Sequence, residues 1–322
     1  MSAEPWRSVH IHRYGLQDEF LVEAVAPVLA DLRDAVPAWF FLRYWQGGHH
    51  IRLRMRTDAD TLDAVTGKLA AYLAEHPSGA DFDADEFRAA QPTMAALEDE
   101  RVDDVLPADT IRPARYTPEL HKYGGERGVR AAERFFHASS EVVLDTLSAA
   151  AGNSGRRLGA GFSMMLRGLL AAGRTPAQMA AFFRHYCLLW APYTFDQFLD
   201  AWPALLEARA PVMRAHAESV LEARLDGDPF HDAVRETWAA VDDDVLDAVT
   251  LAGADAPRER REQVLLVSYL HTHNNRLGLI PEHESFLGFL GHHVLSECAG
   301  ATPADDLPGA VREHREQRLG AS

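Results

Sequence analysis

Residues 38–56 read Ala-Trp-Phe-Phe-Leu-Arg-Tyr-Trp-Gln-Gly-Gly-His-His-Ile-Arg-Leu-Arg-Met-Arg, and this stretch decides the fold of the first part of the chain. Its aromatic half, residues 38–45, predicts a buried strand. Residues 50–56 alternate apolar and basic side chains, which predicts a second strand with one buried face. Residues 46–49 supply a tight turn, because glycine adopts positive φ without steric cost. The stretch therefore predicts an antiparallel hairpin.

The segments around the hairpin extend it to a β-α-β-β-α unit. Residues 6–12 alternate and predict a strand, while residues 17–35 and 60–75 carry apolar side chains at helical spacing. Residues 110–117 look extended, but Pro113 lacks a backbone donor and confines them to an edge or irregular strand.

The rest of the chain predicts helices. Apolar periodicity, interrupted by Gly, Pro or Asn, marks residues 127–150, 158–172, 176–190, 211–225, 230–250, 257–277 and 284–297. The predicted fold class is α+β, with an N-terminal sheet layer followed by a mostly helical half. We expect a sheet-containing lobe at residues 1–125, a helical lobe at residues 126–300, and a charged, mobile tail at residues 301–322. No clean linker separates the lobes, so two domains and one continuous unit are equally open.

The composition argues against several classes of protein. With 322 residues, 47% of them hydrophobic, the chain can bury one large core or two smaller ones. A net charge of −16 repels phosphate backbones, so we expect no nucleic-acid partner. No apolar run approaches the ~20 residues that span a bilayer, and residues 1–6 do not resemble a signal peptide. Two isolated cysteines, Cys187 and Cys298, fit a reduced, cytoplasmic protein.

The second hairpin strand carries basic residues on one face: His50, Arg52, Arg54 and Arg56. Neighbouring guanidinium groups repel each other, so they require solvent, carboxylate partners or an anionic ligand. A solvated face with acidic neighbours is as plausible as a guanidinium pair that holds carboxylates or a developing enolate. Arg43 and Tyr44, on the aromatic strand, would help to shape a pocket.

A second polar segment, Tyr116-Thr-Pro-Glu-Leu-His-Lys-Tyr-Gly-Gly125, places Lys122 and Tyr123 just before a Gly-Gly break. The glycines allow the backbone to approach a neighbour closely. The simpler interpretation of this segment is the start of a helix with a polar surface cluster. The alternative is part of a binding site.

A third segment, Ser268-Tyr-Leu-His-Thr-His-Asn-Asn-Arg-Leu-Gly278, is a polar continuation of an apolar helix. Two adjacent helix faces carry its polar side chains, with Ser268, His271, Thr272 and Asn275 on one and Tyr269, His273 and Arg276 on the other. Such a run in a helix suggests a cavity that receives it, and histidine suits acid–base chemistry near neutral pH. The alternative is a polar helix end with Gly278 as its C-cap.

The sequence contains no pattern typical of a metal or nucleotide site. His271 and His273 are two residues apart, whereas a helical zinc pair uses positions i and i+4. Dinucleotide-binding, phosphate-loop and serine-hydrolase motifs are all missing. We therefore expect neither a metal nor a cofactor.

The three segments together resemble the thiopeptide-type bacteriocin biosynthesis domain, the family of the C-terminal glutamate-elimination domain of class I lantibiotic dehydratases. Residues 39–54, 116–125 and 268–278 resemble its three signatures, in the same order and at similar spacing. The match spans nearly the whole chain. The resemblance implies a ribosomal precursor peptide as substrate and partner, and it is compatible with a homodimer.

Two activities are implied by this resemblance. In elimination, glutamate esterified to Ser or Thr is expelled and leaves a dehydroamino acid. In pyridine synthesis, two dehydroalanines of one peptide undergo a formal [4+2] cycloaddition, and water and the leader peptide are then lost. Neither activity needs a metal or redox cofactor.

The resemblance assigns residues only in part. The paired arginines of the family match Arg52 and Arg54, and its histidine matches His271, with His273 as the alternative. The second-signature arginine of eliminating enzymes is Lys122 here, which keeps the charge but loses the bidentate grip on a carboxylate. The Asn-Asn-Arg-Leu-Gly ending resembles the pyridine-forming branch. We therefore expect a pyridine synthase, with glutamate elimination or a non-catalytic leader-binding scaffold as alternatives.

Catalytic roles are expected for His271 and Tyr269, which would relay protons, and for Arg52 and Arg54, which would hold carbonyl or oxyanion charge. The expected substrate-binding residues are Arg43, Tyr44, His50, Lys122, Tyr123, His273, Asn275 and Arg276. The N-terminal sheet would bind the leader, by strand addition. This hypothesis requires the hairpin arginines and the imidazole of the late helix to meet in one peptide-sized cavity.

Overall fold

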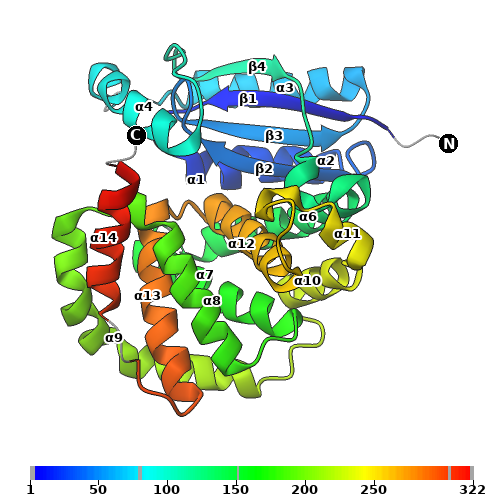
Figure 1. The fold of residues 1–322 in the computed structure, drawn as a ribbon. Helices are drawn as coiled ribbons and strands as arrows, with labels where there is room; N and C mark the ends of the chain where they lie inside the picture. The colour runs from blue at the N-terminus through cyan, green and yellow to red at the C-terminus, as the bar shows by residue number, and fades with distance from the viewer. Residues whose placement is uncertain (1–3, 79–81, 151, 304–305, 320–322) are drawn as a thin grey trace. The chain divides into compact units, whose positions relative to one another are not determined.

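The structure, a computed structural model, describes residues 4–78, 82–150, 152–303 and 306–319. It confirms the α+β class, with a four-stranded sheet near the N-terminus and a mostly helical remainder (Figure 1). The chain divides into a sheet unit, Met1–Pro118 with Ser139–Gly152, and a helical unit, Glu119–Ala138 with Asn153–Ser322. These boundaries differ from the predicted one at residue 125. The chain changes unit in the middle of a long helix, where apolar periodicity gives no sign of a boundary.

The sheet unit contains the predicted β-α-β-β-α order. Its strands are β1 (Trp6–His12), β2 (Ala38–Tyr44), β3 (His50–Arg56) and β4 (Thr110–Ala114). They lie in the order β2-β3-β1-β4, and every neighbouring pair is antiparallel (Figure 1). β4 is an edge strand, as Pro113 predicted. The hairpin turn uses Gly47 and Gly48 at φ 71° and 100°, which a residue with a side chain rarely adopts.

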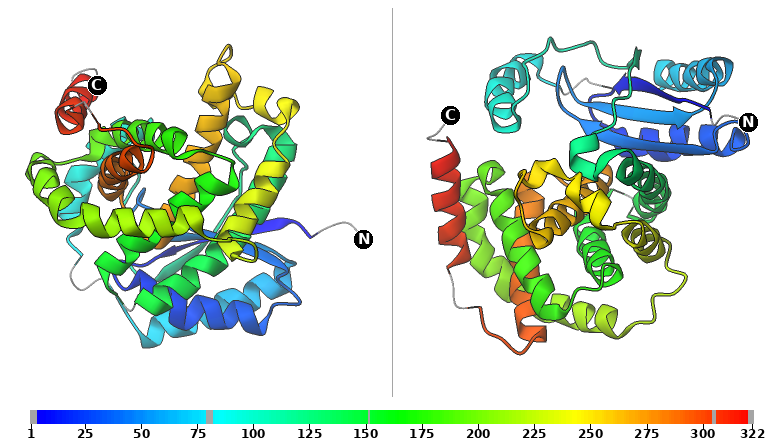
Figure 2. Two further views of the ribbon diagram at one scale, coloured as in Figure 1. Left: turned by 90° about the horizontal axis from the view of Figure 1, so that it is seen from below. Right: turned by 45° about the vertical axis from the view of Figure 1, so that its right-hand side comes forward.

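Side-chain alternation gives this sheet an apolar face and a basic face. Ile51, Leu53 and Met55 of β3 are fully buried, as is Ile11 of β1. On one side of the sheet lie α1 (Gln17–Phe20), the π-helical η1 (Leu21–Val25), α2 (Ala26–Asp31) and α3 (Ala59–Glu75) (Figure 2). The remaining helix of this unit before β4 is α4 (Ala84–Glu98). The basic residues of β3 point away from the apolar face because they occupy the alternate positions.

The helical unit and its junctions contain α5 (Leu120–Tyr123), α6 (Gly125–Ala150), α7 (Ser154–Ala171), α8 (Pro176–Leu189), η2 (Ala191–Tyr193), α9 (Asp196–Glu222), α10 (Pro229–Ala239), α11 (Asp243–Asp247), η3 (Thr250–Ala252), α12 (Arg258–Leu277), α13 (Pro281–Cys298) and α14 (Leu307–Leu319). Helix α9 starts well before the predicted residue 211, because it accommodates Pro203 and Pro211 in its interior. No helix in the described part of the chain combines the length and the apolar character needed to cross a bilayer.

The predicted tail at residues 301–322 contains a helix that the sequence analysis did not expect, α14 at residues 307–319. Leu307 and Val311 are fully buried and join the apolar cluster around Trp202. They lie four residues apart, so they share one helix face. This narrow apolar stripe is hidden among charged residues, which is why the composition of the segment was misleading.

Close packing of α13 against α8 fixes the geometry of the candidate site. A Cβ at Gly288 would lie 2.5 Å from the backbone nitrogen of Cys187, and a Cβ at Gly291 would overlap the ring of Phe183. The two glycines therefore allow α13 to approach α8 more closely than side chains would permit. As a result, the first turn of α13 lies beside the end of α8.

Candidate functional site

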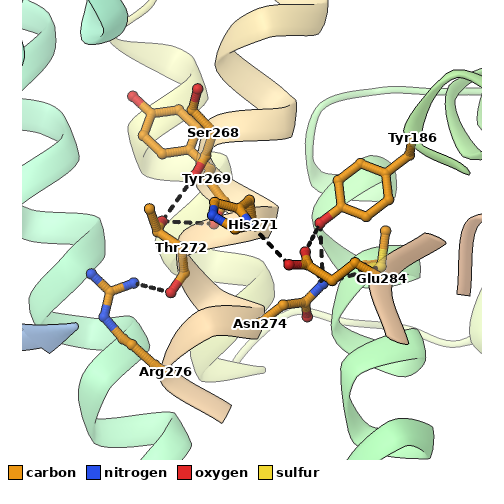
Figure 3. Close-up of polar contacts among 9 residues, drawn as sticks. Tyr186, Ser268, Tyr269, His271, Thr272, Asn274, Arg276 and Glu284 are labelled. Carbon is orange, nitrogen blue, oxygen red and sulfur yellow. Dashed lines mark hydrogen bonds and ion pairs between the residues drawn. The ribbon is translucent and has the colours of Figure 1, made fainter. Parts of the chain in front are cut away.

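His271, near the end of α12, contacts a buried carboxylate. Its Nδ1 lies 2.8 Å from Oε1 of Glu284, which is fully buried, whereas the His271 side chain is 26% exposed (Figure 3). One face of the imidazole stacks on the indole of Trp190, with ring centroids 4.4 Å apart. A partly exposed imidazole held in this way is suited to proton transfer.

The other oxygen of Glu284 is also occupied. Its Oε2 accepts a hydrogen bond from the hydroxyl of Tyr186 and another, at 3.2 Å, from Nδ2 of Asn274 (Figure 3). Both partners are fully buried. Burial, and then the adjacent carboxylate, raises the pKa of Tyr186 well above its usual value, so the phenol keeps the proton that it donates.

Three helices build this network within the helical unit. His271 and Asn274 are three residues apart on α12 and therefore share a face. Tyr186 comes from the last turn of α8, and Glu284 comes from the first turn of α13. A carboxylate is favoured in the first turn because the N-terminal end of a helix carries partial positive charge.

Other polar side chains of α12 bond to the helix itself. The hydroxyls of Ser268 and Thr272 donate to the carbonyls of Val264 and Ser268 at 2.7 and 2.9 Å. Arg276 is fully buried, and its Nη1 donates to the carbonyl of Thr272 at 2.9 Å. Its guanidinium lies 4.9 Å from the ring centroid of Phe136. Much of the polar run therefore serves local packing.

Tyr269 lies in an aromatic cluster that joins the second and third sequence segments. It is 1% exposed, and its ring centroid is 5.7 Å from that of Tyr123 and 5.1 Å from that of Phe135. Burial raises the pKa of its hydroxyl above the usual value. Lys122, beside Tyr123, forms a 3.4 Å ion pair with Glu119. The two segments thus meet through packed rings.

His273 has a different environment from His271. It is 1% exposed, and its ring centroid lies 4.3 Å from that of Phe230. Burial, and then the charge of Arg276, lowers the pKa of His273 to about 3, so this imidazole is neutral at physiological pH. Asn275, which shares the helix face of His271, is half-buried. Between the two candidate histidines, His271 is the better placed to exchange protons.

The basic face of the sheet lies in the other unit, and aromatic rings support its arginines. The guanidinium of Arg52 lies 3.4 Å from the ring centroid of Tyr44, and its Nε donates to Nε2 of His50 at 3.2 Å. The guanidinium of Arg54 lies 4.6 Å from the ring centroid of Tyr116. Cation–π contacts of this kind hold the charge in a fixed position.

Neutral histidines surround Arg52. Burial, and then the charge of Arg52, lowers the pKa of His10 to about 4, and burial lowers that of His50 to about 2. Since Nε2 of His50 accepts from Arg52, its Nδ1 carries the proton and donates to the carbonyl of Gly48 at 2.9 Å. These side chains, with His12, Gln46, Asp103 and Asp104, line a cavity of about 290 Å³.

Arg43 and Tyr44 lie on opposite faces of β2 and have different partners. Tyr44 lies on the basic face, where its hydroxyl donates to Glu100 at 3.1 Å. Arg43 points to the opposite face, because successive residues of a strand alternate. There its Nη2 pairs with Asp18 at 2.6 Å, and its Nη1 donates to Gln17 at 3.2 Å. The contacts of Arg43 are therefore those of a residue that ties β2 to α1.

Comparison with known protein families shows the family of this chain. The family described as lantibiotic biosynthesis dehydratase C-term matches residues 6–295. The chain belongs to this family.

Several solved structures resemble this member of the lantibiotic dehydratase C-terminal family. The pyridine synthase TbtD from thiomuracin biosynthesis matches with a TM-score of 0.72 and 19% identity, over 92% of this chain and 99% of that chain. TsrL matches with a TM-score of 0.60 and 18% identity, over 97% and 99%. The tRNA-dependent lantibiotic dehydratase MibB from Microbispora sp. 107891 matches with a TM-score of 0.54 and 18% identity, over 93% of this chain and 29% of that chain. A search of curated protein sequences gave no match.

Sequence reasoning missed the residues that hold His271 in this family member: Glu284, Tyr186, Asn274 and Trp190. Acidic residues in the first turn of a helix are common, so Glu284 carried no special signal. The sequence offered only the weaker hint that Glu284 lies two residues before the apolar run that starts at Phe286. Within the described residues, no group of three or more His, Cys, Asp or Glu side chains is arranged to hold a metal ion.

Proposed function

We propose that this protein is a thiopeptide-maturation enzyme that forms a pyridine macrocycle in a ribosomal precursor peptide. The reaction is a formal [4+2] cycloaddition of two dehydroalanines, followed by loss of water and of the leader peptide. The observation that carries this proposal is the end-to-end structural match with the pyridine synthase TbtD, over 92% of this chain and 99% of that chain. By contrast, the match covers 29% of the dehydratase MibB. The Asn-Asn-Arg-Leu-Gly ending of α12 supports the same choice.

The proposed reaction needs orientation and proton transfer. Two distant alkenes must be held together, and such orientation can contribute about 7–11 kcal/mol to lowering a barrier. An amide must pass its proton from nitrogen to oxygen to form the azadiene, and later steps must protonate the leaving groups. His271 moves these protons, because its imidazole is partly exposed and held by a carboxylate. Tyr269, with its buried hydroxyl, shapes the cluster beneath α12.

Arg52 and Arg54 hold carbonyl and developing oxyanion charge in the proposed reaction. The neutral state of His10 and His50 supports this role for Arg52, since its guanidinium then supplies the positive charge in the cavity that the three residues line. A guanidinium fixed over an aromatic ring requires little reorganisation when negative charge develops. His50 orients Arg52 through the Nε contact.

The leader peptide binds the sheet unit by strand addition in this proposal. β2 and β4 are the edge strands. The N–H of Phe41 in β2 already donates to Oγ of Ser140 at 3.3 Å. The outer edge of β4 is therefore the better candidate for pairing with an added strand.

Incubation of the protein with a precursor peptide that contains dehydroalanines tests the proposal. We expect mass spectrometry to detect a macrocycle that has lost water and the leader, together with the released leader peptide. The His271→Gln variant should leave the linear peptide unchanged. Recovery of only linear peptide with the native protein, across precursors of varied ring size, would contradict the assignment.

Glutamate elimination is the second candidate. The pairing of His271 with a carboxylate and the family's description as a dehydratase C-terminal domain favour it. In that reaction Arg52, Arg54 and Lys122 hold the glutamyl ester and the enolate. Release of free glutamate from a glutamylated precursor would support it, whereas an Arg52→Ala variant with full elimination activity would refute this role of Arg52. Leader binding without any mass change would instead indicate a scaffold.

A further inference from the structure

Both carboxylate oxygens of Glu284 contact polar groups of the His271 network. Its Oε1 faces Nδ1 of His271, and its Oε2 receives Tyr186 and Asn274 (Figure 3). From this geometry we propose that Glu284 is a positioning residue, which keeps the proton of His271 on Nδ1 and leaves Nε2 as the atom that exchanges protons with the peptide. The inference rests on the proposed function for the role of His271, but the tautomer itself can be measured independently.

The direction of the hydrogen bonds fixes the tautomer. A carboxylate only accepts hydrogen bonds, so the ring nitrogen that faces it must carry a proton. Tyr186 and Asn274 both donate to Oε2, which excludes a proton on that oxygen and favours the ionised form of Glu284, so the hydrogen between Oε1 and Nδ1 belongs to the imidazole. Since the phenol of Tyr186 retains its proton, the donors remain in place across the working pH range. An ionised Glu284 facing Nδ1–H of His271 therefore satisfies both carboxylate oxygens.

Packing fixes the orientation of the ring as well as its proton. Trp190 stacks on the imidazole at a centroid distance of 4.4 Å and an interplanar angle of 29°. Glu284 cannot follow a rotation of the ring, because it is fully buried and held by α8 and α12. With Nδ1 directed at the carboxylate, Nε2 lies on the far side of the five-membered ring. A carboxylate that orients an imidazole through its other nitrogen is a known means of setting histidine chemistry.

Substitution of Glu284 by glutamine has a directional consequence. Because Tyr186 and Asn274 both donate, the amide oxygen of Gln would take the position of Oε2. Its NH₂ group would then face Nδ1 of His271, which would have to accept a hydrogen bond and pass its proton to Nε2. Glu284→Gln should thus reverse the tautomer without removing volume from the core. If the contact between His271 and Glu284 served only to join α12 and α13, reversal of the His271 tautomer would not change turnover.

Nitrogen-15 labelling of histidine allows the tautomer to be read by proton–nitrogen correlation spectroscopy on the full protein. The His271 signals are assigned by their loss in His271→Gln. Over a pH series, we expect the neutral ring to show a protonated Nδ1 and a bare Nε2. A neutral ring protonated at Nε2, or a ring that stays doubly protonated throughout, would overturn the inference.

Measurement of the His271 tautomer in variants is the second test. Glu284→Gln should move the proton of the neutral ring to Nε2, whereas the matched control Glu297→Gln, on the same helix at a partly exposed ion pair, should not. Tyr186→Phe keeps the carboxylate and should keep the native tautomer. If Glu284→Gln left the tautomer unchanged in folded protein, the positioning role would be wrong. The spectrum of the native protein tests the proposal even where this variant does not fold.

Turnover separates this inference from the proposed function. We expect Glu284→Gln to lower kcat about 10²–10⁴-fold with little change in KM, because the reacting nitrogen is in the wrong protonation state. Tyr186→Phe should cost about tenfold or less, since one hydrogen bond to the carboxylate is lost. A native protein inactive on every precursor would remove the proposed function but leave the measured tautomer standing. An active protein in which Glu284→Gln turns over normally would remove the positioning role alone.

Discussion

The two units hold their candidate residues by different physical means. In the sheet unit, Arg52 and Arg54 lie over aromatic rings among neutral histidines, so they provide positive charge that persists at any physiological pH. In the helical unit, a partly exposed imidazole, that of His271, faces the buried carboxylate of Glu284. This difference is the basis of the roles proposed above, in which the sheet unit binds charge and the helical unit transfers protons. Variants that change substrate binding and turnover separately can test whether the two units have these different roles.

Removal of the imidazole should have the largest effect. His271→Ala should lower kcat by about 10²–10⁴-fold, the usual contribution of a general acid or base, with KM nearly unchanged. His314→Ala, an exposed histidine on α14, is the matched control. Kinetics of macrocycle formation measure both. A rise in KM at normal kcat would place His271 among the binding residues and erase the contrast between the units.

Removal of a guanidinium should have a smaller effect, and it should act on kcat/KM rather than on kcat alone. Arg52→Ala should lower kcat/KM by about 10–100-fold, corresponding to one or two strong charge-assisted hydrogen bonds. Arg52→Lys should recover only part of this loss, since lysine lacks the planar group that stacks on Tyr44. Arg88→Ala, at an exposed position of α4, serves as the control. Full recovery by lysine would show that the charge alone matters.

The packing that supports the helical site can be tested with two glycines. Gly288→Ala should destabilise the protein by about 1–3 kcal/mol, because the added Cβ meets the backbone of Cys187. It should also lower turnover, since α13 carries Glu284. Gly159→Ala, where a Cβ meets nothing within 4 Å, should stabilise α7 by about 0.5–1 kcal/mol. Urea unfolding measures both, and equal effects of the two variants would contradict the close approach of α13 to α8.

The neutral histidines of the sheet unit should make the free energy of unfolding depend on pH. The pKa of His10 falls from 6.5 to about 4 on folding, so between these values the unfolded chain binds more protons. Stability from this residue is therefore complete above pH 6.5 and is lost as the pH falls towards 4. His10→Gln should flatten the slope of the free energy of unfolding in this window. An unchanged slope in urea unfolding would indicate that the pKa of His10 is the same in the folded and the unfolded protein.

Much of the fold could be predicted from the sequence because its strands obey simple periodicity. The bounds of β1 and β3 equal the predicted ranges, since alternation over a short strand leaves little freedom of register. The same alternation places Arg43 and Tyr44 on opposite faces. The helix α14 was not predicted because its apolar stripe, which contains Leu307 and Val311, is narrow.

The site was only partly predictable, because its decisive contacts join distant helices. His271 stood out through its polar neighbours in the sequence. Its partner Glu284 is made special by burial, which depends on how closely α13 packs against α8, and no local pattern encodes that distance. Tyr186 and Trp190 looked like ordinary core aromatics of a helical segment. Their roles depend on tertiary contacts, because the hydroxyl of Tyr186 bonds to Glu284 and the ring of Trp190 stacks on His271.

The sheet unit takes its last segment, Ser139–Gly152, from far along the chain. During synthesis on the ribosome, this unit therefore cannot be completed when β4 emerges, and must wait until the second half of α6 has been translated. Until then the edge of β2 lacks Ser140, the bonding partner of Phe41, and exposes an aromatic strand to other nascent chains. A fragment that ends at Pro118 would keep that open edge permanently, so we expect it to aggregate rather than fold.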